Sequence, residues 1–254
     1  MDLFDISGKK VIFTGASGGL GRGMVEGMLE AGAEVAMIGA SPKSTAMAQQ
    51  YQARGWKAHG LQCDLGDHER LRQTFDQALA LLGGEVDVLV NAAGIQRRDK
   101  SEEFSLEDWE AVMNINLTVT FLLCQMAGKQ MIRQKHGGKI INIASMLSFF
   151  GGVTVPAYAA SKGGVAQLTK ALCNEWARYG ITVNAIAPGY MDTPMNTALT
   201  DPANPRFQEI TNRIPAGRWG TPDDMKGLVI FLAAPASDYV NGAIIPCDGG
   251  YLVK

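Results

Sequence analysis

Short apolar runs alternate with longer amphipathic stretches along most of the chain. We predict seven β-strands at the apolar runs 11–14, 34–39, 57–64, 86–91, 139–145, 181–188 and 243–246. Between them, the periodicity of apolar residues predicts helices over 19–31, 43–54, about 106–134 and 157–179, one on the stripe Leu71, Phe75, Ala78 and Leu82, and one starting near Thr221. The run at 86–91 is apolar almost throughout, which is typical of a parallel strand covered on both faces. The alternation therefore predicts an α/β fold, with one seven-stranded parallel sheet and helices on both faces.

Composition narrows the classes of protein that fit this pattern. The chain has 254 residues, 46% of them hydrophobic, and no linker or repeat interrupts it, so we expect one doubly wound Rossmann domain over 1–254. A net charge of −2 without a basic stripe argues against nucleic-acid binding. Two acids precede the first apolar run, and no apolar segment approaches the roughly 18–20 residues that span a bilayer, so we expect neither a signal peptide nor membrane insertion. The four cysteines form no CxxC pair, which predicts reduced thiols and a cytoplasmic protein, and the three histidines lack metal-ligand spacing, so no metal site is expected.

A glycine-rich turn, TGASGGLG at 14–21, follows the first predicted strand and opens the first predicted helix. Gly15 permits a tight turn, and Gly19 and Gly21 let the backbone approach a phosphate. The helix N-terminus then offers free N–H groups to a pyrophosphate, with the Ser17 hydroxyl as a further donor. A plain tight strand-to-helix connection is the alternative interpretation, and the absence of GK[ST] excludes a P-loop.

Tyr158 and Lys162 stand four residues apart in the small-residue stretch PAYAASKGG, on one face of a predicted helix. A nearby cation favours the phenolate, so the lysine is expected to lower the tyrosine pKa and make it an acid/base. Ser145 ends the fifth predicted strand, and ligands bind at the carboxyl ends of parallel strands. The alternative is a tyrosine–lysine pair that shares an exposed helix face by chance.

Six motifs in order resemble the short-chain dehydrogenase/reductase family over essentially the whole chain. They are the TGxxxGxG spacing, NAAG at 91–94, NINL at 114–117, Ser145, YAASK at 158–162 and PG at 188–189. The resemblance implies an NAD(P)-dependent oxidoreductase acting on CH–OH groups. It implies that Ser145 binds the reacting oxygen, Tyr158 is the acid/base and Lys162 also holds the nicotinamide ribose. Asn116 would keep a water in the proton path, with Asn114 as the competing position and a structural role open for both.

The same resemblance implies a set of cofactor-binding residues and a choice of cofactor. The set is Gly15, Ser17, Gly19, Leu20, Gly21, Ser41, Asp64, Leu65, Asn91, Ala92, Gly94, Tyr158, Lys162, Pro188, Gly189 and Thr193. For Asp64 a turn-capping role is the alternative. Residues 39–41 lack the acid that usually binds the adenosine ribose, and Gly18 stands where NADP-preferring relatives often carry a basic residue. The expected cofactor is NAD or NADP, with NAD slightly favoured by the branch of the family described next.

The stretches 94–99, 137–149, 187–191 and 213–220 are similar to 2-keto-3-deoxygluconate dehydrogenases, also called 2-dehydro-3-deoxy-D-gluconate 5-dehydrogenases. Gluconate 5-dehydrogenases share much of this pattern, and a 3-ketoacyl thioester reductase is a further alternative. Arg97 and Arg98 follow the fourth strand, where a guanidinium fork would match a sugar-acid carboxylate. We expect at least one of them, preferably Arg98, to bind substrate with Ser145 and Tyr158; two solvated surface arginines are the alternative.

Two further expectations concern the C-terminal third. The proline-rich segment at about 191–215 is expected to form a lid over the substrate. The apolar end segment SDYVNGAIIPCDGGYLVK resembles the family's oligomer surface and implies a homotetramer, or else a last strand that packs only on its own sheet.

Two rival classes of function are weighed against an oxidoreductase. A serine hydrolase on Ser145 would need a histidine after it, and His136 is the last in the chain. A nucleotide-sensing or scaffold protein on the same fold would not need the Asn, Ser, Tyr and Lys set.

Overall fold

The seven predicted strands form one parallel sheet in the order β3-β2-β1-β4-β5-β6-β7. The computed structural model describes residues 3–201 and 203–254. The strands are β1 Lys10–Thr14, β2 Glu34–Gly39, β3 Ala58–Gln62, β4 Val88–Asn91, β5 Gly138–Ile143, β6 Ile181–Pro188 and β7 Ile244–Cys247. The strand order reverses between β1 and β4, and open sheets of this kind bind ligands at such a switch point.

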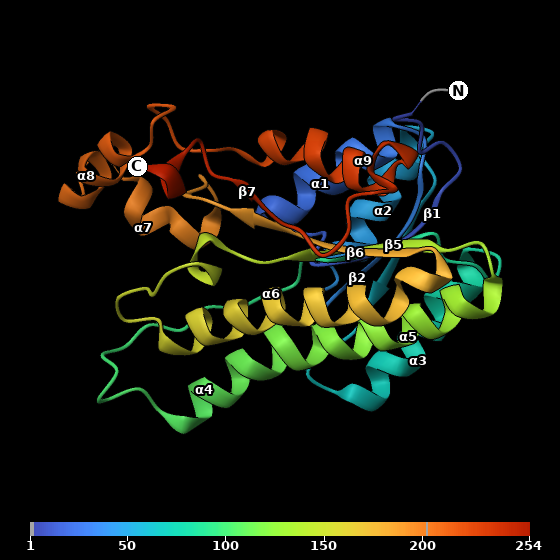
Figure 1. Cartoon of the computed structure of the whole chain (residues 1–254), viewed down its shortest axis with the longest axis horizontal. Helices are drawn as coiled ribbons and strands as arrows, with labels where there is room; N and C mark the ends of the chain where they lie inside the picture. The colour runs from blue at the N-terminus through green and yellow to red at the C-terminus, as the bar shows by residue number, and fades with distance from the viewer. Residues whose placement is uncertain (1–2, 202) are drawn as a thin grey trace.

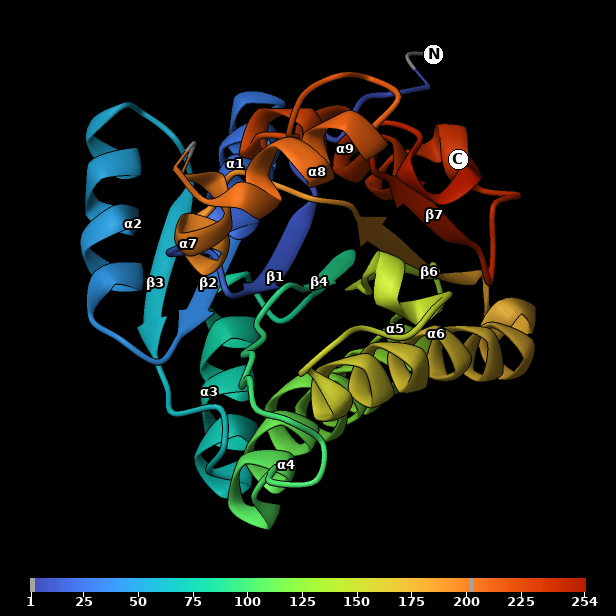
Figure 2. The same cartoon turned by 90° about the vertical axis from the view of Figure 1, so that its left-hand side faces the viewer.

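Helices cover both faces of the sheet (Figure 1). They are α1 Gly19–Glu30, α2 Lys43–Ala53, α3 His68–Leu81, α4 Leu106–Met113, α5 Val119–Gln134, α6 Pro156–Trp176, α7 Thr197–Thr200, α8 Pro205–Arg213 and α9 Lys226–Ala233. Helices α1, α2 and α9 lie on one side, and α3, α4, α5 and α6 lie on the other (Figures 1 and 2). The predicted doubly wound Rossmann fold is thereby confirmed.

Alternate residues of the central strands pack into two separate hydrophobic cores, one on each face of the sheet. Val11 and Phe13 of β1 pack into the core under α1 and α9, whereas Ile12 packs with α3 and α5 on the opposite face. All three side chains are fully buried. This two-sided burial explains why the strands are apolar throughout instead of alternating.

The predicted helix over 106–134 is continuous but not regular. Between α4 and α5, the turn Asn114–Thr118 is a π-helix. Such wide turns occur mostly as local features of α-helices at functional positions.

This helical run also corrects the expectation that no segment suits a bilayer. By length and composition alone, Leu106–Gln134 could cross a membrane, with a mean hydropathy of 1.4 in its most apolar window. Its buried side, however, is part of the protein core: Leu123 and Met131 pack beneath the sheet. The remaining apolar side chains on its outer side include Phe121, which is 39% exposed.

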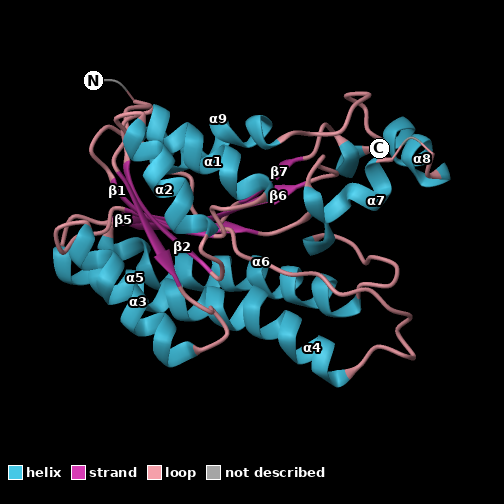
Figure 3. Cartoon of the chain, turned by 180° about the vertical axis from the view of Figure 1, so that it is seen from behind, coloured by secondary structure: helices cyan, strands magenta, loops and turns pink. Residues whose placement is uncertain are grey.

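The segment predicted as a lid lies at one end of the molecule, over the carboxyl ends of the strands (Figures 1 and 3). It contains two short helices, α7 and α8, where the sequence showed little periodicity. Pro202, within the predicted lid, lies outside the described residues.

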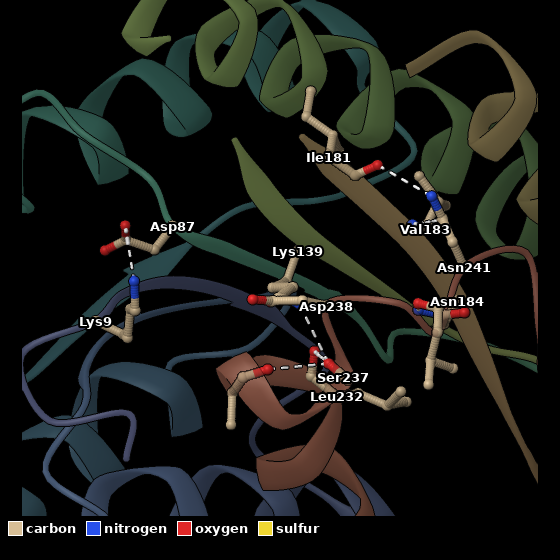
Figure 4. Close-up of polar contacts among 12 residues, drawn as sticks. Lys9, Asp87, Lys139, Ile181, Val183, Asn184, Leu232, Ser237, Asp238 and Asn241 are labelled. Carbon is tan, nitrogen blue, oxygen red and sulfur yellow. Dashed lines mark hydrogen bonds and ion pairs between the residues drawn. The ribbon is translucent and has the colours of Figure 1, made fainter. Parts of the chain in front are cut away.

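At the amino ends of the strands, most of the polar groups are paired with one another (Figure 4). Lys139 Nζ lies 2.7 Å from Asp238 Oδ1, and Lys9 Nζ lies 3.7 Å from Asp87 Oδ1. The Asn241 side chain accepts from Val183 N at 2.7 Å. The contacts of Asp238 and Asn241 fasten the segment before β7 to the sheet.

Candidate active site

The glycine loop between β1 and α1 has the close packing that its sequence predicts. Gly15 adopts φ +76°, and a Cβ there would lie 2.6 Å from the backbone nitrogen of Ala93. A Cβ on Gly21 would overlap the carbonyl oxygen of Gly15. Both positions therefore require glycine.

The first turn of α1 fits a bound phosphate. Its N-cap is Gly18, which makes no side-chain capping hydrogen bond, and no acid stands in the first turn. The amide N–H groups at this helix start thus have no side-chain acceptor and face the crevice with the positive end of the helix dipole. These features fit the pyrophosphate of a dinucleotide.

The loop opens onto a crevice of about 330 Å³ at the carboxyl ends of β1, β4, β5 and β6. The predicted residues that line it are Gly15, Gly19, Leu20, Gly21, Ala92, Gly94, Ser145, Tyr158, Lys162, Pro188, Gly189 and Thr193. Sequence reasoning left out further lining residues: Gly18, Met24, Ala93, Ile143, Ala144, Met191, Pro194 and Asn196. Gly18 and Ala93 lie within motifs already noted, so the motifs themselves carried a signal for them. The apolar side chains carried none.

Ser145, Tyr158 and Lys162 meet in this crevice. The strand ends at Ile143, two residues earlier than predicted, and Ser145 caps the short turn Met146–Ser148, its hydroxyl accepting from Leu147 N at 3.1 Å. Ser145 and Tyr158 both line the crevice, where the Ser145 hydroxyl acts to lower the pKa of Tyr158. Lys162 is buried, and its ammonium donates to the Ile143 carbonyl at 2.6 Å and lies 5.7 Å from the centre of the Tyr158 ring.

The electrostatics of the tyrosine differ from the sequence-based expectation. Burial raises the pKa of Tyr158, although the Ser145 hydrogen bond and the charge of Arg98 act to lower it. Burial also lowers the pKa of Lys162 to about 8. Desolvation therefore opposes the charged forms of both groups, and the lysine does not by itself lower the tyrosine pKa here. The groups that assist ionisation are Ser145 and Arg98.

The π-helical turn places Asn116, not Asn114, beside the crevice. Asn116 accepts from Ile95 N at 2.8 Å and donates to Ile95 O at 3.0 Å and to Ser161 Oγ at 3.1 Å. A Cβ on Gly94 would lie 3.3 Å from Asn116 Oδ1 and 3.7 Å from Lys162 Nζ, so the amide and the ammonium flank the same glycine. Asn114 is turned away and lies 2.6 Å from His68 Nε2.

Five residues of the predicted cofactor set lie outside the lining of this crevice. They are Ser17, Ser41, Asp64, Leu65 and Asn91. Asp64 accepts from Gly66 N at 3.0 Å, which fits its turn-capping alternative. The Asn91 side chain is buried and donates to Asn142 Oδ1 at 2.9 Å, so it joins β4 to β5.

A second cavity of about 260 Å³ adjoins the crevice and shares Ser145, Tyr158, Gly189 and Asn196 with it. Arg98 lines this cavity, and Arg97 does not. Arg97 instead pairs with Asp108 at 3.1 Å on the surface. The structure thus places Arg98 at the cavity and Arg97 outside it, a distinction that the sequence did not make.

The serine hydrolase alternative fails on geometry. His136 lines a cavity at the amino ends of the strands, at the opposite edge of the sheet from Ser145. Within residues 3–201 and 203–254, no group of three His, Cys, Asp or Glu side chains could hold a metal ion.

A glycine loop at the switch point of a doubly wound sheet, beside a serine, a tyrosine and a lysine, defines a dinucleotide-dependent oxidoreductase. Comparison with known proteins identifies the class more closely. Residues 9–204 match the short chain dehydrogenase family. The chain belongs to this family, and the predicted NAD(P)-dependent oxidoreductase acting on CH–OH groups is confirmed.

Three similar proteins extend over the whole chain. A 2-dehydro-3-deoxy-D-gluconate 5-dehydrogenase of Dickeya dadantii is 47% identical, with 100% of this chain and 99% of the relative aligned. The crystal structure of a putative NAD(P)-dependent gluconate 5-dehydrogenase of Beutenbergia cavernae, with bound NADP, is 43% identical with a TM-score of 0.94, covering 99% and 100% of the two chains. A gluconate 5-dehydrogenase of Burkholderia cenocepacia, solved with NADP and tartrate, is 40% identical with a TM-score of 0.94, covering 100% and 98%.

Proposed function

We propose that this enzyme interconverts a secondary alcohol and a ketone on a sugar acid, with 2-dehydro-3-deoxy-D-gluconate, reacting at position 5, as the substrate. One observation carries the proposal: the cavity that holds the Tyr158 hydroxyl also holds Arg98, which has no ion-pair partner among the described residues. A guanidinium beside the reacting position suits an anionic substrate. The name of the Dickeya relative agrees with this substrate class.

When bound, a nicotinamide dinucleotide would supply the hydride acceptor for the alcohol carbon in oxidation and the hydride donor for the ketone in reduction. Ser145 holds the reacting oxygen by a hydrogen bond, and Tyr158 takes the hydroxyl proton during oxidation and gives it back during reduction. The positive charge of Arg98 and the Ser145 hydroxyl both favour the phenolate. They oppose the burial that raises the pKa of Tyr158, so the phenol is set to donate its proton in reduction, and proton removal during oxidation depends on these two groups.

Lys162 and Asn116 complete the proton route in this proposal. The lysine ammonium lies behind the tyrosine ring, fixed by the Ile143 carbonyl, and is placed to hold a ribose hydroxyl. Its lowered pKa of about 8 lets it exchange a proton near neutral pH. Asn116, on the other side of Gly94, would hold the water that links the lysine to solvent.

For the cofactor, we propose that both NAD and NADP serve, with kcat/KM values within about tenfold of each other. No acid follows β2 to repel a 2′-phosphate, since the positions after it are Ala40 and Ser41. Lys43 starts α2 on the surface nearby and offers one positive charge, without the arginine fork that would strongly favour NADP. The Beutenbergia and Burkholderia structures were solved with NADP.

Gluconate is the second candidate substrate, since two similar solved structures are named for gluconate 5-dehydrogenases. A matrix of kcat/KM for both cofactors against 2-dehydro-3-deoxygluconate, gluconate, 5-ketogluconate and a 3-ketoacyl thioester tests the proposal. We expect the highest value for the deoxy keto acid. Turnover of the thioester alone would contradict a sugar-acid enzyme.

The predicted homotetramer and cytoplasmic location also remain proposals. Strand β7 lies at the edge of the sheet, Tyr239 before it is fully exposed, and Leu106 and Phe121 project from the α4–α5 run. These apolar groups fit contact with further copies of the chain. Light scattering should give four times the chain mass of 27.2 kDa. All four cysteines carry free thiols, which fits a reducing compartment.

A further inference from the structure

A third arginine, Arg213, lines the substrate cavity from the lid side. It is the last residue of α8, which lies over the carboxyl ends of the strands (Figure 2). Its guanidinium carbon lies 4.4 Å from the centre of the Tyr251 ring, near the C-terminus of the chain. Both residues line the same cavity as Arg98 and Tyr158.

Arg213 rests on a cluster of packed aromatic rings. Tyr251 packs edge-on against Tyr190, with ring centres 5.2 Å apart, and Tyr190 packs in the same way against Trp219. Trp219 Nε1 donates to Thr211 Oγ1 at 2.9 Å, which ties the last turn of α8 to this aromatic cluster. The Arg213 residue itself is exposed, and its guanidinium lies on the Tyr251 ring, where an arginine can stack and still donate to an anion.

Arg213 also leaves a nearby carboxylate unused. Glu209 stands four residues earlier on α8, the spacing at which a glutamate and an arginine commonly pair. No ion pair forms between them, and none of the ion pairs among the described residues involves Arg213. The guanidinium lies on the tyrosine ring instead, so its donors remain available to a ligand.

Three arginines, Arg98, Arg206 and Arg213, line this cavity, together with Glu209. Arg98 and Arg213 act on different parts of the site. The charge of Arg98 influences the Tyr158 hydroxyl, whereas that of Arg213 influences Tyr251. In a six-carbon acid that reacts at C5, four carbon–carbon bonds separate the reacting carbon from the carboxylate carbon. A contact beyond the immediate surroundings of Tyr158 is therefore needed to hold the carboxylate at both of its oxygens.

We propose that Arg213 is a substrate-specificity residue, which binds the sugar-acid carboxylate from the lid side while Arg98 approaches it from the β4 side. This inference rests on the proposed function. It assigns to α8 the recognition of the anionic end of the substrate, at the point where Arg213 already contacts Tyr251 near the C-terminus.

The test compares 2-dehydro-3-deoxygluconate with its methyl ester, which lacks the charge. For Arg213→Ala, we expect KM for the acid to rise at least tenfold, kcat to stay within threefold, and KM for the ester to stay unchanged. Arg213→Lys keeps the charge without the fork and should fall between wild type and Arg213→Ala. The matched control is Arg178→Ala, an exposed arginine that also lies on a tyrosine ring, Tyr179, but away from the cavity; it should change neither KM.

An unchanged KM for the acid in Arg213→Ala would overturn the inference. An equal rise for acid and ester would do so as well, because it would mean that the arginine only supports the aromatic cluster. Should Arg213→Ala fold poorly, Arg213→Gln and Arg213→Lys give the same comparison. Wild-type enzyme that turns over no sugar acid would instead refute the proposed function, which separates the two failures.

Discussion

Cavities lined by charged residues lie at both ends of the parallel strands, but the charges are paired at the amino ends and, in the described part of the chain, unpaired at the carboxyl ends. At the amino ends of the strands, Lys9 and Lys139 are matched by Asp87 and Asp238 (Figure 4). At the carboxyl ends, Arg98 and Arg213 have no carboxylate partner among the described residues.

The effect of burial on titratable groups also differs between the two ends of the strands. The crevice at the carboxyl ends raises the pKa of Tyr158 and lowers that of Lys162 to about 8, because both charged forms are buried with few compensating partners. Perturbed groups of this kind cluster where a protein does chemistry. The presence of charge in a cavity is therefore a poor guide to function, whereas unpaired or desolvated charge is a useful one. The amino-end cavity has one exception, the buried Thr182 hydroxyl, which has no hydrogen-bond partner.

The largest effect is expected for Gly21→Ala, which forces a methyl group onto the Gly15 carbonyl. We expect cofactor binding to be lost and the free energy of unfolding to fall by about 1–3 kcal/mol from overpacking. Cofactor titration by fluorescence and thermal unfolding measure both. The control is Gly227→Ala in α9, where a new methyl group meets no atom within 4 Å; it should be neutral or slightly stabilising.

Lys162→Met should lower kcat by about 10²–10⁴ through loss of the proton route, and should raise thermal stability. Burying a charged lysine costs stability when it is protonated in both the folded and unfolded states, which holds below its folded pKa of about 8. The gain in Tm, at least about 2 °C at pH 7, should therefore shrink as the pH rises from 8 through the unfolded pKa of about 10.4. Thermal unfolding from pH 6 to 10 measures it, with the exposed Lys170→Met on the same helix as a control. A variant less stable than wild type at pH 7 would contradict this account of the lysine.

Arg98→Ala should raise KM for the sugar acid about tenfold or more, because the arginine lies in the substrate cavity with no other partner. Its neighbour Arg97 pairs with Asp108 outside the cavity, so Arg97→Ala should leave KM unchanged. Steady-state kinetics on both variants decide between them. Equal effects would mean that the cavity does not distinguish the two arginines.

The smallest effect on stability and activity is expected for a substitution at the amino ends of the strands. Asp238→Asn breaks the pair with Lys139, but the Asp238 side chain is 72% exposed, so water screens the interaction. The free energy of unfolding should change by less than about 1 kcal/mol, with kcat and KM unaltered. Chemical denaturation and initial rates check this; a large loss of activity would give the amino-end cavity a functional role that its pairing argues against.

The sequence predicted the fold well because its strong signals are local. Apolar runs located every strand and most of the helices between them, with strand ends wrong by a few residues at most, as at β3 and β5, whereas the short helices α7 and α8 were missed. Chemistry carried by motifs was equally accessible. Ser145 follows β5, and Tyr158 and Lys162 lie one turn apart on α6; all three line the crevice at the carboxyl ends of the strands.

Features that depend on packing were not accessible. The π-helical turn that presents Asn116 could not be predicted from the periodicity, and the Asn116 hydrogen bonds to Ile95 and Ser161 join segments that are far apart in the chain. The separation of Arg97 from Arg98 depends on Asp108, eleven residues away. Arg213 was missed because its role arises from an aromatic cluster assembled from the lid and the C-terminus.

The sequence also predicted the wrong direction for the pKa shift of Tyr158. The spacing of Tyr158 and Lys162 predicted a lowered pKa, but spacing does not report desolvation, and burial outweighs the attraction of the nearby charges.

The most direct test of the account is the turnover of Tyr158→Phe, which removes only the hydroxyl from the crevice. We predict that kcat for the sugar acid falls by about 10²–10⁴ while the dissociation constants of NAD and NADP stay within a few-fold of wild type. A kcat within tenfold of wild type would contradict Tyr158 as the acid/base, and with it the assignment of the carboxyl-end crevice as the catalytic site.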